Sequence, residues 1–342
     1  MGPWLVKGQS FAMVDRTVDL GLSSTSTSGI LGFCFPSVAA IPTNVGQTLL
    51  ASLMSLFPPP LQCFAFWLSR DANRAGSLTI GTLDFTLVPN PALIANFSVV
   101  RTGHEFDYWK LPLLHLTIDD QLFTLSSSRI PGAANPIAVL DTGTTLILGP
   151  FADVKALYAT LGSAARYDSD IGYQVLCKHA VIIGFVFGFP AREFRLHPAD
   201  IAWAEGGTED EWCTGGIQAN DNVNSGDWLL GDCFLRNVYA IHCYSPPSIG
   251  LLSMTTFPEA LEEFRAERGD DGEDGGDGDD DSDLVSAVVD GSDRWATATG
   301  YVKRWEQPPS GTAARVFGTV AGGFGFVVGG IGAASWRFWR GV

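Results

Sequence analysis

The sequence predicts an all-β fold, and three observations support this prediction. The chain has 342 residues, of which 46% are apolar, so it can form a large buried core. It contains 39 glycines and 19 prolines, a content typical of a β protein with many turns. Between residues 105 and 255, short apolar runs alternate with turn residues. We therefore expect β structure over residues 1–100 and again over residues 101–257.

A few helices should interrupt these strands. Residues 47–57 carry apolar side chains at helical spacing, and the three prolines at 58–60 end the segment. A second helix should begin at Pro150 and close at Gly162, with its apolar residues facing inward. Residues 259–267 predict a short polar helix. The uncharged run at residues 181–189 predicts a strand of the core.

One segment carries the chemistry. The apolar residues 138–140 are followed by Asp141-Thr142-Gly143-Thr144, a strand that ends in a glycine turn. Such a turn holds a carboxylate rigidly at the rim of a cleft, and the two threonine hydroxyls can donate hydrogen bonds that fix it. Two carboxylates about 3 Å apart cannot both ionise, so one can act as acid and the other as base on a water. This mechanism requires two such turns.

The sequence contains a single turn of this kind. No second Asp-Thr-Gly or Asp-Ser-Gly occurs in it, and the earliest alternative is Asp15-Arg16-Thr17. That tripeptide follows an apolar run but lacks the glycine of the turn. We interpret Asp15 as an ordinary surface or turn residue.

The motifs around Asp141 resemble those of the pepsin-like aspartic protease family. The resemblance covers residues 4–252 and is carried, in order, by residues 29–37, 64–68, 76–81, 108–113, 228–232, 234–239 and 249–251. It implies a bilobal acid protease fold. It also implies that the substrate is an extended peptide with apolar residues on both sides of the cleaved bond. It also implies that Asp141 is one of two water-activating carboxylates, and that Gly143, Thr144 and Thr145 line the cleft beside the substrate backbone.

The chain departs from the family pattern at its start. The first lobe should open with its own Asp-Thr-Gly turn and then a flap tyrosine, yet the earliest tyrosine is Tyr108, already in the second lobe. We therefore expect a truncated first lobe, a complete second lobe, and no activity in this chain. One hypothesis is a protease whose sequence begins late. The alternative is an inactive homologue that acts as a peptide-binding or membrane-tethered interaction module.

The resemblance also bears on the cysteines and on localisation. Cys177 and Cys213 lie where the family carries a second-lobe disulfide. We interpret the other four cysteines as buried small apolar residues: Cys34, Cys63, Cys233 and Cys243. Asn96 begins a glycosylation sequon. No signal peptide is visible, but the family is normally secreted, so we expect the secretory pathway and an extracellular or vacuolar location.

The C-terminal quarter differs in character. Residues 258–315 form a predicted disordered linker, with nine acidic residues between 270 and 283. Residues 316–336 carry no charge, are long enough to cross a membrane, and include glycines at small-xxx-small spacing. The basic tail 337–342 would then lie in the cytosol. The alternative for this segment is a flexible glycine-rich tail.

Other classes of function are disfavoured. The net charge of −16 argues against nucleic-acid binding, which requires clustered basic residues. The five histidines show no metal-ligand spacing, and an acidic loop starting at Asp277 lacks the glycine and glutamate of a calcium site. No serine-hydrolase elbow or phosphate-binding loop occurs. We expect a peptide or protein substrate, no metal and no cofactor. The oligomeric state is left open.

Overall fold

The computed structural model describes residues 5–11, 30–39, 46–71, 73–101, 103–203, 211–223 and 225–269, together with the backbone of residues 316–318 and 325–327. Within these residues the chain is mostly β, as the sequence predicts. The strands are β1 (Ile30–Gly32), β2 (Cys63–Trp67), β3 (Gly76–Ile80), β4 (Ala95–Ser98), β5 (Lys110–Ile118), β6 (Gln121–Phe123), β7 (Ile137–Leu140), β8 (Ile147–Gly149), β9 (Ala165–Asp168), β10 (Gly172–Leu176), β11 (Ile183–Phe187), β12 (Arg192–Arg195), β13 (Ala202–Trp203), β14 (Trp212–Gly215), β15 (Ile217–Ala219), β16 (Trp228–Leu230), β17 (Val238–Tyr244), β18 (Pro247–Ser253), β19 (Val316–Gly318) and β20 (Gly325–Val327).

The helices are short and lie between strands. They are α1 (Leu49–Met54), α2 (Phe151–Thr160), α3 (Pro198–Ile201), α4 (Asp232–Leu235) and α5 (Glu259–Arg268). The three helices predicted from the sequence correspond to α1, α2 and α5. The first of these is shorter than predicted, and it begins later because Thr48 caps it: the Thr48 side-chain oxygen accepts a hydrogen bond from the Ala51 amide. The predicted core strand corresponds to β11, in which every residue is buried.

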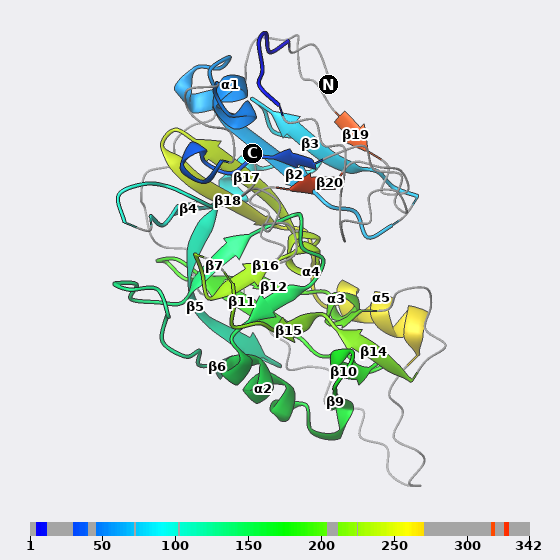
Figure 1. Ribbon diagram of the computed structural model, residues 1–342. Coiled ribbons are helices and arrows are strands. Elements are labelled where there is room, and N and C mark those ends of the chain that lie inside the picture. The colour runs from blue at the N-terminus through cyan, green and yellow to red at the C-terminus, as the bar shows by residue number, and fades with distance from the viewer. Residues whose placement is uncertain are drawn as a thin grey trace, which may run out of the picture.

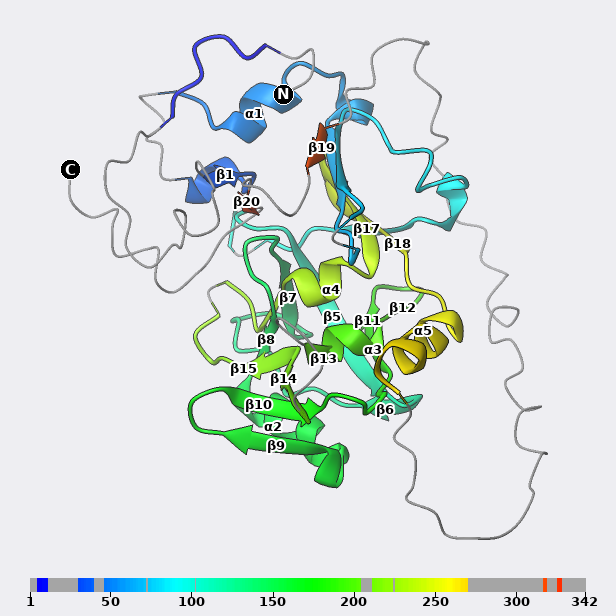
Figure 2. The ribbon, with the colours of Figure 1, turned by 90° about the vertical axis from the view of Figure 1, so that its right-hand side faces the viewer.

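The strands form two larger sheets that follow one another along the molecule (Figure 1). The first has the order β19-β3-β2-β17-β18-β4. The second has the order β12-β11-β5-β7-β16-β8-β15, and β6 pairs with β5. Because β17 and β18 pair with β2 and β4, the late part of the chain returns to complete the sheet that the early part begins. Figure 2 shows this return beside α4, which lies where the two sheets meet.

Smaller sheets complete the arrangement. Strands β13, β14, β10 and β9 form a four-stranded sheet near α2, and β1 pairs with β20 in parallel. One continuous apolar core links the two larger sheets. Its largest buried side chains include Phe64, Trp109, Phe185, Trp228 and Phe234. Burial of side chains of this size is the main source of stability of such a fold.

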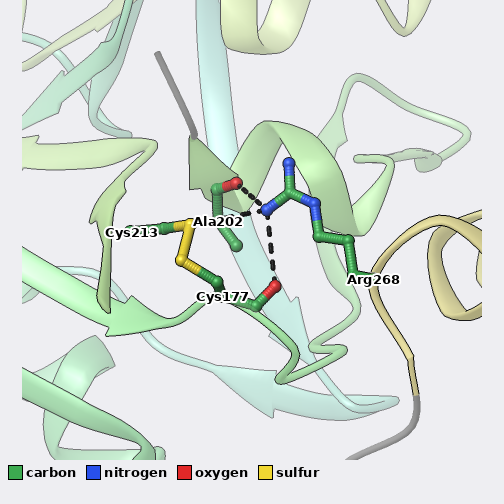
Figure 3. Close-up of a disulfide and its surroundings, with 4 residues drawn as sticks. All are labelled: Cys177, Ala202, Cys213 and Arg268. Carbon is green, nitrogen blue, oxygen red and sulfur yellow. Dashed lines mark hydrogen bonds between the residues drawn. A yellow bond between two sulfur atoms is a disulfide. The ribbon is translucent and has the colours of Figure 1, made fainter. Parts of the chain in front are cut away.

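The predicted disulfide between Cys177 and Cys213 is present and lies beside the side chain of Arg268, the last residue of α5 (Figure 3). Arg268 Nη1 donates to the Ala202 carbonyl at 2.7 Å and to the Cys177 carbonyl at 3.4 Å, and it lies 3.5 Å from Cys213 Sγ. Phe264 of the same helix is fully buried. Helix α5 is therefore attached to the four-stranded sheet through one guanidinium group, and its Phe264 packs into the apolar core.

The interpretation of Cys63 and Cys243 as unpaired buried residues is wrong, because the two form a second disulfide. They occupy directly opposite positions on β2 and β17. Their sequence separation is 180 residues, so only the folded sheet brings them together. Cys34 and Cys233 are not in disulfides. Burial raises the pKa of both thiols.

We predict that each disulfide contributes several kcal/mol to the free energy of unfolding. The chain-entropy model gives about 4 kcal/mol for Cys177–Cys213 and about 5 kcal/mol for the longer Cys63–Cys243 loop. Urea unfolding of Cys177→Ala/Cys213→Ala and of Cys63→Ala/Cys243→Ala should show losses of this order. Equal stability of wild type and either double variant would contradict the prediction.

The predictions for the C-terminal quarter mostly lie outside the described residues. This holds for the linker after residue 269 and for most of the predicted membrane segment 316–336. Near the other end of the chain, Asp15 also lies outside the described residues. The described residues of that segment, β19 and β20, are extended rather than helical, so a helix does not form at these positions. Glycine disfavours a helix by about 1 kcal/mol per residue, which accounts for this difference. No helix in the described part of the chain is long and apolar enough to cross a membrane.

His242 is a buried ionisable residue among aromatic rings. Its imidazole is fully buried on β17 and stacks on Phe64 and Phe66, with ring centroids 4.8 Å and 5.1 Å away. The Trp109 ring meets it edge-on at 5.0 Å. Burial lowers the pKa of His242 to about 3, an effect that the Ala240 backbone partly offsets.

This position should make the fold sensitive to acid. Between pH 6.5 and about 3, the unfolded chain binds a proton at His242 that the folded chain excludes, so stability falls as pH falls through this window. Relative to His242→Phe, the free energy of unfolding of wild type should decrease by roughly 3 kcal/mol between pH 7 and pH 4. Urea unfolding of both proteins at each pH measures this. A difference between them that does not change with pH would refute it.

Candidate active site

Asp141 follows β7, a strand at the centre of the second sheet. β7 pairs with β5 on one side and runs parallel to β16 on the other. The Asp141 amide donates to the Leu230 carbonyl at 3.0 Å, which extends the pairing with β16 to the start of the turn. The Asp141 side chain is fully buried. A strand that is fixed on both sides gives this carboxylate a rigid support.

The turn after β7 closes around the carboxylate. Oδ1 accepts a hydrogen bond from the Gly143 amide at 2.9 Å, and Oδ2 accepts one from Thr144 Oγ1 at 2.8 Å. The Thr144 amide donates to the Asp141 carbonyl at 3.3 Å. The predicted role of the Thr144 hydroxyl in fixing the turn is therefore confirmed. The position and plane of the carboxylate are set by bonds to both of its oxygens.

The other predicted cleft residues surround Asp141 on the exposed side of the turn. Gly143 and Thr145 are exposed, while Thr142 and Thr144 are half-buried. This exposure would allow a peptide to approach the turn from that side. Contact of Gly143, Thr144 and Thr145 with a substrate stays a prediction.

The junction between β16 and α4, at residues 230–233, supports the turn. A Cβ atom at Gly231 would lie 2.2 Å from the Thr144 carbonyl oxygen and 2.4 Å from that of Leu146. The Asp232 amide donates to the Thr144 carbonyl at 2.8 Å, and the Cys233 amide donates to that of Thr145 at 2.9 Å. The Asp141 turn is thus held by close backbone contacts that leave no room for a Cβ atom at position 231.

Asp232 is a residue of the site whose importance sequence reasoning missed. Burial raises its pKa to about 7; the nearby charges of Asp141 and Asp200 also raise it, and Arg236 opposes this shift. Asp232 therefore changes protonation state near neutral pH, and its carboxyl group interacts electrostatically with that of Asp141. A signal was present in the sequence, because Asp232 follows an apolar strand and a glycine.

Tyr108 also lies in the electrostatic environment of Asp141. Its side chain is almost completely buried. Burial raises the pKa of Tyr108 to about 12, with smaller contributions from Cys34, Asp107 and Asp141. The phenol therefore stays protonated at any pH at which the fold is expected to work.

The remaining predicted sites lie away from Asp141. Asn96 is exposed on β4, at the edge of the first sheet, and its amide donates to the Ile94 carbonyl at 3.3 Å. Its glycosylation stays a prediction. Among the residues that the structure describes, no three His, Cys, Asp or Glu side chains are grouped so that they could hold a metal ion.

Comparison with known proteins agrees with this geometry. Residues 1–254 match the family model described as eukaryotic aspartyl protease. The chain is 28% identical to Major aspartyl peptidase 1 of Cryptococcus neoformans over 268 residues, which are 74% of this chain and 53% of that protein. It is 28% identical to the aspartic protease pepA of Leptosphaeria maculans, covering 66% of this chain and 51% of that protein. With cathepsin D of Bos taurus it shares 25% identity over 72% of this chain and 60% of the relative. The chain thus spans between half and about three fifths of the length of these relatives.

Proposed function

The chain belongs to the eukaryotic aspartyl protease family, and from this membership we infer that Asp141 is one of the two water-activating carboxylates of a pepsin-like endopeptidase. The observation that carries the inference is the turn itself, in which both Asp141 oxygens accept hydrogen bonds at the end of a central strand. The function of the whole protein is proposed on this basis.

In the proposed reaction, two carboxyl groups share one proton across the cleft. One carboxylate accepts a proton from the attacking water, while the protonated partner donates to the carbonyl oxygen of the peptide bond. The Gly143 amide and the Thr144 hydroxyl keep Asp141 in place throughout. Because reacting groups must be held to a fraction of an ångström, this rigidity is what the turn contributes to catalysis.

The second carboxylate would come from a first-lobe turn outside the 342 residues. The sequence contains one Asp-Thr-Gly, and we propose that the first lobe in this chain is truncated. The substrate would be an extended peptide lying along Gly143, Thr144 and Thr145. Two disulfides and an exposed sequon at Asn96 support the secretory pathway, since disulfides persist in oxidising compartments.

A second candidate function is peptide binding without cleavage. The single Asp-Thr-Gly turn in the sequence favours it. A folded cleft with one carboxylate could still hold a peptide, but it could not divide acid and base roles between two groups.

One experiment separates the two functions. The 5′ end of the transcript would be mapped, and the longest reading frame that contains residues 1–342 would be expressed. The protease proposal expects a second Asp-Thr-Gly or Asp-Ser-Gly turn and cleavage of denatured globin at acid pH, blocked by a transition-state-analogue inhibitor. A longest frame without a second turn, whose product binds peptides but leaves globin intact, would establish the non-catalytic function instead.

A further inference from the structure

Asn237 is the centre of a buried polar cluster between the two larger sheets. It lies between α4 and β17 and is fully buried. Its Nδ2 donates to Asp200 Oδ2 and to the Cys233 carbonyl, each at 2.8 Å. Three donors converge on its Oδ1: Arg70 Nη2 at 2.6 Å, Thr255 Oγ1 at 2.6 Å and the His197 amide at 2.8 Å. Every hydrogen-bonding atom of the amide is therefore used.

The cluster joins segments that are far apart in the sequence. Arg70 follows β2, while His197 and Asp200 lie at α3 and Thr255 follows β18. Arg70 also forms an ion pair with Asp200, whose side chain is 2% exposed. Arg236 lies 3.9 Å from the same carboxylate. The buried charge of Asp200 is balanced by two arginines, and Asn237 bridges Asp200 and Arg70.

The cluster is connected to the catalytic turn through α4. This helix has only four residues, too few to be stable without support at its ends. At its C-terminal end, Asn237 bonds to the carbonyls of Cys233 and Phe234. At its N-terminal end, the amides of Asp232 and Cys233 bond to the carbonyls of Thr144 and Thr145, in the turn that carries Asp141. A single short element thus lies between the cluster and the turn.

We propose that Asn237 is a positioning residue for the Asp141 turn. Together with Arg70 and Asp200, it fixes the position of α4. Helix α4 then holds the Asp141 turn through the amides of Asp232 and Cys233. This inference rests on the proposed function in so far as the turn is catalytic. The physical coupling between Asn237 and the turn does not depend on it. Because Arg70 belongs to the cluster, the segment after the early strand β2 contributes to the geometry of the Asp141 turn, more than 60 residues later.

The test measures the turn directly, without an activity assay. Asn237→Leu removes all five side-chain bonds while keeping a similar volume. Hydrogen exchange followed by NMR should show the amides of Asp232 and Cys233 exchanging at least tenfold faster relative to the amides of β11. Water would then reach Asp232, so its carboxyl titration, followed by ¹³C NMR, should move from about pH 7 downward by at least one pH unit.

Two further variants complete the design. Arg70→Met should give the same pattern to a smaller degree, and Arg74→Met is its matched control, since Arg74 stacks on Trp67 outside the cluster. If Asn237→Leu does not fold, Thr255→Val removes one donor to Asn237. This variant should still show faster exchange of the Asp232 and Cys233 amides relative to the amides of β11. Uniform acceleration of all amides, or an unchanged Asp232 titration in a folded variant, would show that the cluster is structural only. Absence of proteolysis in every preparation would refute the proposed function and leave this result unaffected.

Discussion

The 342-residue chain alone should leave denatured globin uncleaved at acid pH. Its sequence holds one Asp-Thr-Gly turn, and the proton shared in the proposed reaction requires two carboxylates in close contact. Loss of one of two such groups typically removes at least about three orders of magnitude of rate. The measurement is globin cleavage by the purified chain with and without a transition-state-analogue inhibitor, beside the Asp141→Asn variant as a blank.

Inhibitor-sensitive cleavage that disappears in Asp141→Asn would contradict this expectation. Its dependence on protein concentration would then identify the source of the second carboxylate. A rate that rises with the square of concentration would show that two copies each supply Asp141. A rate proportional to concentration would place the partner within one chain, and Asp232 would be the first residue to replace.

Gly231→Ala should cost at least about 3 kcal/mol of folding free energy. The added Cβ would lie 2.2 Å and 2.4 Å from the carbonyl oxygens of Thr144 and Leu146, so the backbone itself would have to move. Overpacking usually costs about 1–3 kcal/mol, and displacement of backbone places this site at the upper end or beyond. The same displacement would disturb the turn that carries Asp141.

Gly132→Ala is the matched control for this substitution. Gly132 has φ +81° but nothing within 4 Å of an added Cβ, so only the backbone strain of about 1 kcal/mol applies. Urea unfolding of both variants at pH 7 gives the comparison. A Gly231→Ala loss no larger than that of Gly132→Ala would mean that the junction between β16 and α4 does not contact the turn closely.

Much of the site was predictable because its signals are local. The Asp141 turn depends on four consecutive residues, and α2 on apolar spacing after Pro150. The pairing of Cys177 with Cys213 came from resemblance to the family and was confirmed. Each of these predictions needs only a short window of sequence or a known pattern.

What the sequence did not reveal depends on contacts between distant segments. Cys63 and Cys243 meet because β2 pairs with β17, and nothing near either residue indicates this pairing. The cluster around Asn237 brings together Arg70 and Asp200, which are 130 residues apart. The unusual pKa of Asp232 likewise arises from burial and from charges that only the fold places nearby.

The proposed role of Asp141 is tested most directly by globin cleavage at acid pH, using the product of the longest reading frame that contains these 342 residues and its Asp141→Asn variant. The proposal predicts that the wild-type product cleaves globin. The variant should lose at least about a thousandfold in kcat, with its Tm unchanged. Retention of cleavage by the folded variant, or no cleavage by a wild-type product that carries two Asp turns, would contradict the proposal.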